Sequence, residues 1–308
     1  MLKILVTGVN GFVGKHLLRE LKSRGYKVIG LGHESPARPV VQELADDYEA
    51  CDLTDEAQVA AIDLEGINAI INLAGLANVG ASFDAEELYK KVNVDVLAKL
   101  GERLLAMKSR TRLVAISTGA VYDPNQPVPL TESSKIIEHG SPYALSKIIM
   151  ETVARELQAK GLDCIIVRPF NHTGPGQAPG FLIPDLFQKL TKFKETGEPV
   201  KIGNLTTKRD YTDVRDIVKG YADLAVAETL EFDLYNICSG KSRSGQEILD
   251  LMLNAMDLKG KVEVAVDQSL IRPNDPPDLH GSNQRLREET GWEPTIPLET
   301  TINDFAAQ

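Results

Sequence analysis

A tyrosine and a lysine stand four residues apart, as Tyr143 and Lys147, in a segment that reads Ser-Pro-Tyr-Ala-Leu-Ser-Lys from residue 141. A helical pattern begins here, and residues at positions i and i+4 share one face of a helix. A free phenol has a pKa near about 10, but an ammonium group held close to it lowers that pKa. The pair is therefore a candidate general acid/base unit. Taken alone, the spacing also fits an exposed tyrosine beside a solvated lysine.

The composition is that of a globular protein with one large domain or two that share a boundary. The chain has 308 residues, of which 43% are hydrophobic and 25% are charged. A net charge of −10 argues against a nucleic-acid or anionic-membrane binder, although it permits a local basic pocket for phosphate. We see no secretory signal and no membrane-spanning apolar run, so we expect a cytoplasmic protein. The distant cysteines Cys51, Cys164 and Cys238 predict neither a disulfide framework nor a metal site.

Three glycines lie between a predicted strand and a predicted helix near the start of the chain. Residues 2–6 are an apolar run typical of a buried parallel strand, and a helical pattern follows from Phe12 to just before Gly25. Between them, Gly8 permits a tight turn, Gly11 lets the backbone approach a pyrophosphate, and Gly14 lets helix and strand pack closely. The helix N-terminus supplies free N–H groups for the phosphates. The segment predicts a dinucleotide site.

The Gly-x-x-Gly-x-x-Gly spacing, with threonine before it and phenylalanine after the second glycine, resembles the extended short-chain dehydrogenase/reductases. The resemblance implies an α/β fold: a Rossmann-type, doubly wound parallel sheet with a smaller C-terminal substrate-binding lobe. It also implies that several small or apolar residues contact the cofactor, with Asp52 and Leu53 at the adenine. We consider it equally consistent that Asp52 caps a helix starting near Asp55. The implied contacts in the glycine loop and after the strand at residues 67–73 are Gly8, Asn10, Gly11, Phe12, Val13, Leu73, Ala74 and Gly75.

The end of the second predicted strand, residues 27–32, bears on the choice of cofactor. NAD-binding folds usually carry an acid there for the ribose 2′-hydroxyl. Here His33 occupies the region, Glu34 is one step later, and Arg38 follows. Basic groups near a missing acid favour NADP(H), with NAD(H) as the alternative if Glu34 takes the acid's role or if the loop is simply solvated.

A buried strand over residues 112–116 ends in two hydroxyl residues, Ser117 and Thr118. A Ser-Thr pair at a strand end often caps the backbone. In the family, a hydroxyl at the position of Thr118 bonds the reacting oxygen, and nucleotide-sugar 4,6-dehydratases place acids directly after it. Gly119 and Ala120 stand there instead, which argues against a dehydratase. On the preceding helix, expected from about residue 85 to 108, Asn93 occupies a family-like anchoring position.

The second half carries two long motifs. Residues 168–177, Arg-Pro-Phe-Asn-His-Thr-Gly-Pro-Gly-Gln, resemble the branch that contains GDP-mannose 4,6-dehydratases and GDP-4-dehydro-6-deoxymannose reductases. Asn171 is then a candidate contact to the sugar or its diphosphate, whereas His172 alone reads as a loop residue. Arg209, in an Arg-Asp-Tyr-Thr-Asp segment, and Arg272 are candidates for gripping the diphosphate, since a guanidinium fork matches phosphate oxygens.

The resemblance implies a cofactor domain over residues 1–167, to which segments near 211–240 return, and a substrate lobe over 168–308. The expected reaction is NAD(P)H-dependent reduction of a 4-keto nucleotide sugar, with GDP-4-dehydro-6-deoxy-D-mannose converted to GDP-D-rhamnose. Tyr143 would protonate the C4 oxygen, Lys147 would lower the tyrosine pKa, and Thr118 would orient the ketone. The alternatives are a nucleotide-sugar 4-epimerase with bound NAD and a non-catalytic NADP sensor. A homodimer is expected from the resemblance alone.

Overall fold

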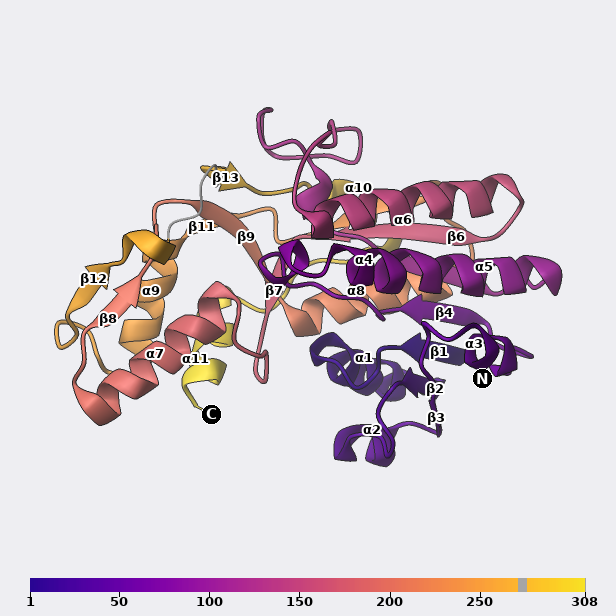
Figure 1. Cartoon of the computed structure of the whole chain (residues 1–308), viewed down its shortest axis with the longest axis horizontal. Helices are drawn as coiled ribbons and strands as arrows, with labels where there is room; N and C mark the ends of the chain where they lie inside the picture. The colour runs from indigo at the N-terminus through magenta and orange to yellow at the C-terminus, as the bar shows by residue number, and fades with distance from the viewer. Residues whose placement is uncertain (271–275, 308) are drawn as a thin grey trace.

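The computed structural model describes residues 1–270 and 276–307. Seven strands in that part of the chain form one parallel sheet, in the order β10-β6-β5-β4-β1-β2-β3. The chain starts at the centre of the sheet and winds outward on both sides, which is the doubly wound arrangement. The predicted α/β class is confirmed (Figure 1). The strands are β1 (Lys3–Thr7), β2 (Lys27–Gly32), β3 (Asp47–Ala50), β4 (Ala69–Asn72), β5 (Arg112–Ile116), β6 (Cys164–Pro169) and β10 (Leu234–Ile237).

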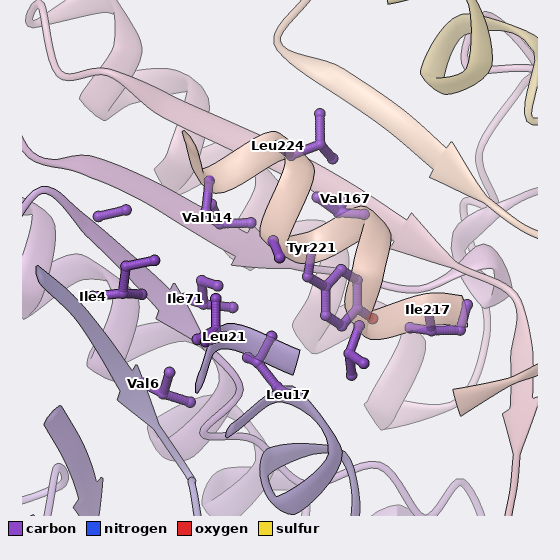
Figure 2. Close-up of a cluster of buried hydrophobic side chains, with 14 of the residues drawn as sticks. Ile4, Val6, Leu17, Leu21, Ile71, Val114, Val167, Ile217, Tyr221 and Leu224 are labelled. Carbon is purple, nitrogen blue, oxygen red and sulfur yellow. The ribbon is translucent and has the colours of Figure 1, made fainter. Parts of the chain in front are cut away.

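Helices cover both faces of this sheet, so its central strands are buried on both sides. Along β1, Ile4 and Val6 enter one apolar cluster while Leu5 enters the other, as the two-residue period of a strand requires. Figure 2 shows the first cluster, with side chains from the sheet and from α1 and α8. This face is covered by α1 (Phe12–Ser23), α2 (Pro39–Leu44), α8 (Val214–Val226) and α10 (Gln284–Thr290), and the other by α3 (Glu56–Ala61), α5 (Val96–Ala106) and α6 (Pro142–Ala159).

The helix expected from about residue 85 to 108 is interrupted. It consists of α4 (Glu86–Lys90), one π-helical segment over Lys91–Asp95, and α5. A π-helical insertion adds one residue to a turn and re-aims the side chains that follow it. Here it contains Asn93, which is buried, so the irregularity coincides with the position that the sequence singled out.

A second lobe has its own apolar core and two small sheets. Its helices are drawn at the left of Figure 1, beside β8 and β12. One sheet joins β9 to β11 and β13, with β7 also paired to β9, and the other joins β8 to β12. The elements are β7 (Asn171–Thr173), α7 (Leu182–Thr196), β8 (Val200–Ile202), β9 (Lys208–Asp213), β11 (Ser242–Ser244), α9 (Gly245–Ala255), β12 (Val264–Val266), β13 (Asp278–Leu279) and α11 (Leu298–Ala306).

The chain passes between the two lobes more than once. After β9 it forms α8, which packs against α1, and then β10, which pairs with β6 in the main sheet. Residue 167 lies inside β6, so the second lobe starts after that strand ends. Among residues 1–270 and 276–307, no helix combines the length and apolar composition needed to cross a membrane.

Candidate active site

The parallel strands bring the expected site residues to one edge of the sheet. In the paired registers Thr7 lies beside Leu31 and Asn72, and Ile116 lies beside Val167. The segments that follow these strands therefore emerge together at their carboxyl ends, where open α/β sheets bind ligands. These segments carry the glycine loop, Glu34, Ala74, Thr118 and Asn171, which are far apart in the sequence.

The glycine loop packs so tightly against neighbouring backbone that side chains would not fit at two of its glycines. Gly8 has φ +65, and a Cβ atom there would lie 2.9 Å from the backbone nitrogen of Ala74. A Cβ atom on Gly14 would lie 2.3 Å from the carbonyl oxygen of Val9. Gly11 precedes α1 and offers no side chain to cap it, so N–H groups at the helix start remain available to an anion. The geometry fits the phosphates of a dinucleotide.

A short hydrogen-bond chain holds the wall beside this loop. The backbone N–H of Ala74 donates to the Thr7 hydroxyl at 3.0 Å, and that hydroxyl donates to the Asn72 side chain at 2.6 Å. The next residue, Gly75, leaves little room for a side chain, since a Cβ atom would lie 3.0 Å from Asn93 Oδ1 and 3.4 Å from Lys147 Nζ. The small residues after β4 thus allow the segment beside the glycine loop to lie close to the Lys147 ammonium.

The basic residues after β2 are balanced by an acid. Arg38 donates to Glu34 Oε1 at 2.8 Å through Nη2, and its side chain stays 60% exposed. The other carboxylate oxygen of Glu34 is buried and has no hydrogen-bond partner among the described residues. Asn10 accepts the Arg38 backbone N–H at 3.0 Å and donates to the Tyr48 hydroxyl at 3.1 Å. His33 is exposed. The cofactor's adenosine ribose would therefore meet both a cation and a carboxylate.

The alternative reading of Asp52 as a helix cap is wrong. Asp55 caps α3, accepting N–H groups of Ala57 and Gln58 at 2.9 and 3.1 Å. Asp52 instead accepts the backbone N–H and the hydroxyl of Thr54 at 2.9 and 2.8 Å, in a tight turn after β3. Its carboxylate is exposed at the edge of the sheet, and its adenine contact stays a prediction.

Tyr143 and Lys147 lie one turn apart at the start of α6. Ser141 caps this helix by accepting the Ala144 N–H at 3.2 Å, and proline follows at the first helical position. Both site side chains are buried, with 8% of Tyr143 and 7% of Lys147 exposed. The Lys147 ammonium donates to the Ile116 carbonyl at 2.7 Å, which ties α6 to the end of β5. The Thr118 hydroxyl, two residues further on, caps the next turn by accepting the Ala120 N–H at 3.2 Å. It also lies near enough to Tyr143 to affect the pKa of that phenol.

Burial dominates the electrostatics of the pair. It raises the pKa of Tyr143, an effect that the nearby Thr118 hydroxyl opposes. Burial lowers the pKa of Lys147 to about 8, and the Glu151 carboxylate opposes this. The expectation that Lys147 lowers the tyrosine pKa is not met in this structure, because its ammonium binds a carbonyl and burial outweighs the hydroxyl contact. A neutral phenol is a proton donor, so the arrangement suits a general acid.

Asn93 anchors the elements around the pair. Its side chain accepts the Leu76 N–H at 2.8 Å, donates to the Leu76 carbonyl at 3.2 Å and donates to the Ser146 hydroxyl at 2.9 Å. Ser146 in turn donates to the Tyr143 carbonyl at 2.7 Å. These bonds join the loop after β4 to the first turn of α6 and give Asn93 a structural role.

The expected substrate residues lie on β7 and β9. Asn171 is exposed at the start of β7, and Arg209 lies on β9 with its guanidinium donating to the Pro276 carbonyl at 2.8 Å. His172 lies within β7 and makes the kind of backbone bond expected of it, since its ring Nδ1 bonds the Phe170 carbonyl at 3.1 Å. Its ring also stacks on Phe12, with 6.5 Å between centroids and 3° between planes. Arg272 lies outside the described residues.

Three neighbours of the Tyr143–Lys147 pair were not predicted as site residues. Tyr89 packs edge-on against Tyr143, with ring centroids 6.4 Å apart. Glu151 and Arg168 form a buried ion pair behind Lys147, with a shortest distance of 2.6 Å. The sequence held one indication that Glu151 lies near the pair, since Glu151 follows Lys147 by four residues, as Lys147 follows Tyr143. In the described residues, no group of three His, Cys, Asp or Glu side chains is arranged to hold a metal.

Comparison with known proteins identifies the family. The model of the NAD dependent epimerase/dehydratase family matches residues 4–238. This chain belongs to that family. It is 28% identical over 304 residues to the GDP-6-deoxy-D-mannose reductase of Pseudomonas aeruginosa, covering 97% of this chain and 94% of the relative. It is 27% identical over 330 residues to the UDP-glucose 4-epimerase of Yersinia enterocolitica, covering 98% of this chain and 96% of the relative.

A solved structure supports the same placement. The structure of RMD from Pseudomonas aeruginosa, complexed with NADPH, superposes with a TM-score of 0.83 and 26% identity, covering 100% of this chain and 98% of the other. The predicted resemblance to the extended short-chain dehydrogenase/reductases is thereby confirmed. The family supports an NAD(P)-dependent enzyme that acts on nucleotide sugars. Its members include reductases, epimerases and dehydratases, so the family alone leaves the reaction open.

Proposed function

We propose that this protein is an NAD(P)H-dependent reductase of the 4-keto group of a nucleotide-linked 6-deoxy sugar. The observation that carries the proposal is the burial of Thr118, Tyr143 and Lys147 together at the end of β5 and the start of α6, with no acid directly after the threonine. The preferred substrate is GDP-4-dehydro-6-deoxy-D-mannose, with GDP-D-rhamnose as product. The 28% identity to a GDP-6-deoxy-D-mannose reductase supports this choice.

The residues at positions 119 and 120 limit the chemistry. Removal of water from a sugar needs a proton donor or acceptor near C5 and C6 in addition to the C4 acid. Gly119 lies against the ring of Phe170, where a Cβ atom would be 3.0 Å away, and Ala120 has no titratable group. A single acid at C4 suits reduction of a ketone already formed.

In the proposed reaction the bound cofactor supplies hydride to C4. Tyr143 donates its phenolic proton to the C4 oxygen as negative charge develops there, and the ketone becomes a secondary alcohol. Thr118 orients the oxygen through its hydroxyl. Lys147, held between the Ile116 carbonyl and the small residues after β4, would face the nicotinamide ribose. Proton uptake from solvent then restores the phenol.

We propose that Gly8, Asn10, Gly11, Phe12 and Val13 surround the pyrophosphate and that Asp52 and Leu53 meet the adenine. We retain NADP(H) as the favoured cofactor, because the exposed Arg38 guanidinium can turn toward a 2′-phosphate. NAD(H) is the alternative, favoured by the unpartnered oxygen of Glu34, which could accept a ribose hydroxyl. On the substrate side, Asn171 and Arg209 would contact the sugar and the diphosphate, and Arg272 stays a candidate on sequence grounds.

The protein is proposed to act in the cytoplasm as a homodimer. Apolar side chains stay exposed on or near the helices beside the site: Leu88 is 50% exposed, Met107 47% and Ile149 42%. Exposed apolar surface of this kind is a common feature of subunit contacts. Sedimentation analysis, with Ile149→Lys as the disrupting variant, tests the dimer.

The deciding experiment is oxidation of NADPH by the purified protein with GDP-4-dehydro-6-deoxy-D-mannose, followed by near-UV absorbance and by NMR of the product. Rapid oxidation with one 6-deoxy sugar product is expected. A second candidate, a nucleotide-sugar 4-epimerase, is favoured by the 27% identity to a UDP-glucose 4-epimerase. Tightly bound NAD in the purified protein, with epimerisation of a UDP-hexose and no net NADPH consumption, would replace the reductase proposal with this one.

A further inference from the structure

A buried ion pair lies directly behind the Tyr143–Lys147 pair. Arg168 donates to both carboxylate oxygens of Glu151, through Nε at 2.8 Å and Nη2 at 2.6 Å. The Ser117 hydroxyl donates to the same carboxylate at 2.6 Å. All three side chains are buried, with 4% of Glu151, 3% of Arg168 and 2% of Ser117 exposed. Stability alone does not explain such a pair, because a protein with two apolar residues in its place is often no less stable.

The carboxylate joins three elements that build the site. Glu151 lies on α6, Ser117 follows β5, and Arg168 lies on β6. Ser117 stands between Ile116, whose carbonyl accepts from Lys147, and Thr118, whose hydroxyl lies near the Tyr143 phenol. Ser117, which Glu151 holds by a hydrogen bond, is therefore the chain neighbour both of Thr118 and of the carbonyl that binds Lys147.

The same carboxylate is the anion one helical turn behind Lys147. The charged or titratable groups around this ammonium and carboxylate are Tyr143, Glu151 and Arg155 on α6 and Arg168 on β6, with Asn93 as a neutral neighbour. Arg155 Nη2 lies 3.9 Å from Glu151 Oε2. Arg168 leans over the Tyr122 ring, 4.7 Å from its centroid. Its Nη1 atom is buried without a partner among the described residues. Arg168 thus pairs with Glu151, and Lys147, one helical turn along α6, is a further cation influenced by the same carboxylate.

We propose that Glu151 is a positioning residue of the reaction, holding Ser117 and Thr118 in register with α6 and providing the negative charge that keeps Lys147 protonated. The role extends the proposed ketone reduction and rests on it for its kinetic consequences. The effect on Lys147 itself is independent of the substrate. Glu156, an exposed acid on the same helix, offers the matched comparison, since it carries the same charge in solvent.

The sign of the expected pH effect follows from the burial of Lys147. Burial lowers the lysine pKa to about 8, and Glu151 opposes that change. Without the carboxylate the pKa falls further, so the ammonium is lost at a lower pH. The alkaline limb of the kcat profile should move to lower pH in Glu151→Gln, and kcat at pH 8.5 should fall at least about threefold. KM for the nucleotide sugar should not change, since Glu151 touches no substrate.

The test measures the Lys147 pKa directly, by NMR of carbon-13-labelled lysine in the full chain without substrate, with the resonance assigned from Lys147→Arg. Glu151→Gln is expected to lower this pKa, and Glu156→Gln to leave it unchanged. Ser117→Ala removes the hydrogen bond and keeps the charge, so it should lower kcat without moving the pKa. An unchanged Lys147 pKa in a folded Glu151→Gln protein overturns the proposal.

Glu151→Gln leaves Arg168 without its partner and can unfold the protein. The double variant Glu151→Gln/Arg168→Met removes both charges and restores a foldable core. Its Lys147 pKa should still lie below that of the wild type, and an unchanged value there also overturns the proposal. If the wild type reduces no 4-keto sugar while the pKa shift appears, the proposed function fails and the electrostatic role of Glu151 stands.

Discussion

The two sides of the proposed site are built in different ways. On the cofactor side the shape comes from the backbone: Gly8 has φ +65 and Gly14 leaves no room for a Cβ atom beside Val9. On the substrate side the expected contacts are long side chains, such as Arg209, from strands of a separate lobe. A site shaped by the backbone can therefore be predicted from the spacing of glycines. A site made of side chains cannot, because its geometry depends on how distant segments come together.

Tyr143 is the proposed acid of the reaction, and its removal should have the largest effect. Tyr143→Phe removes the phenolic proton donor and keeps the ring against Tyr89. We expect kcat to fall by about 10²–10⁴-fold, with cofactor affinity little changed. Steady-state NADPH oxidation and fluorescence titration of the cofactor measure both. The control is Tyr26→Phe, which lies directly before strand β2 and outside the site. Near-normal turnover in Tyr143→Phe would remove the tyrosine from its role as acid.

A backbone-built site should be intolerant of a single methyl group. Gly14→Ala places a Cβ atom 2.3 Å from the Val9 carbonyl oxygen, so helix α1 must shift. We expect a loss of about 1–3 kcal/mol in the free energy of unfolding and a weaker cofactor complex. Urea unfolding with and without NADPH measures these changes. Arg19→Ala, an exposed site on the same helix, should be neutral, and equal stability of the two variants would contradict the close packing.

A side-chain-built site should lose affinity and keep its fold. Arg209→Ala removes a guanidinium proposed to bind the diphosphate, and charge-assisted hydrogen bonds contribute about 1.5–3 kcal/mol each. KM for the nucleotide sugar should rise by about 10–100-fold, with kcat and the melting temperature nearly unchanged. The neighbouring exposed Lys208→Ala is the matched control on β9. An unchanged KM in Arg209→Ala would exclude that arginine from the diphosphate site.

The smallest effect should be at the adenosine ribose, where backbone and side chains both contribute. Arg38→Ala frees Glu34, whose carboxylate then repels a 2′-phosphate and accepts a 2′-hydroxyl. The ratio of kcat/KM for NADPH to that for NADH should fall by about tenfold or less, because Arg38 is exposed and its charge is screened. Side-by-side kinetics with both cofactors measure the ratio. A wild-type preference for NADH would instead favour Glu34 as the ribose ligand.

Much of the cofactor half could be predicted from local patterns. The strand before Gly8, the helix after Phe12 and the helix carrying Tyr143 follow from apolar periodicity and turn residues, which act over a few positions. The cap on α3 was less clear, because Asp52 and Asp55 are both good capping residues and only the backbone path selects Asp55. The reach of Lys147 to the Ile116 carbonyl was not predictable, because it joins segments 31 residues apart.

The sequence by itself determined the class of fold, and it predicted a phosphate loop and an acid/base pair. These depend on residue types at short, regular spacings, where backbone geometry leaves few alternatives. Only the tertiary structure decided that Lys147 donates to a carbonyl instead of the phenol, that Glu34 holds Arg38, and that Glu151 and Arg168 are buried together behind the site. The physical reason is burial: the charge state and partner of a side chain depend on which distant segments exclude water around it.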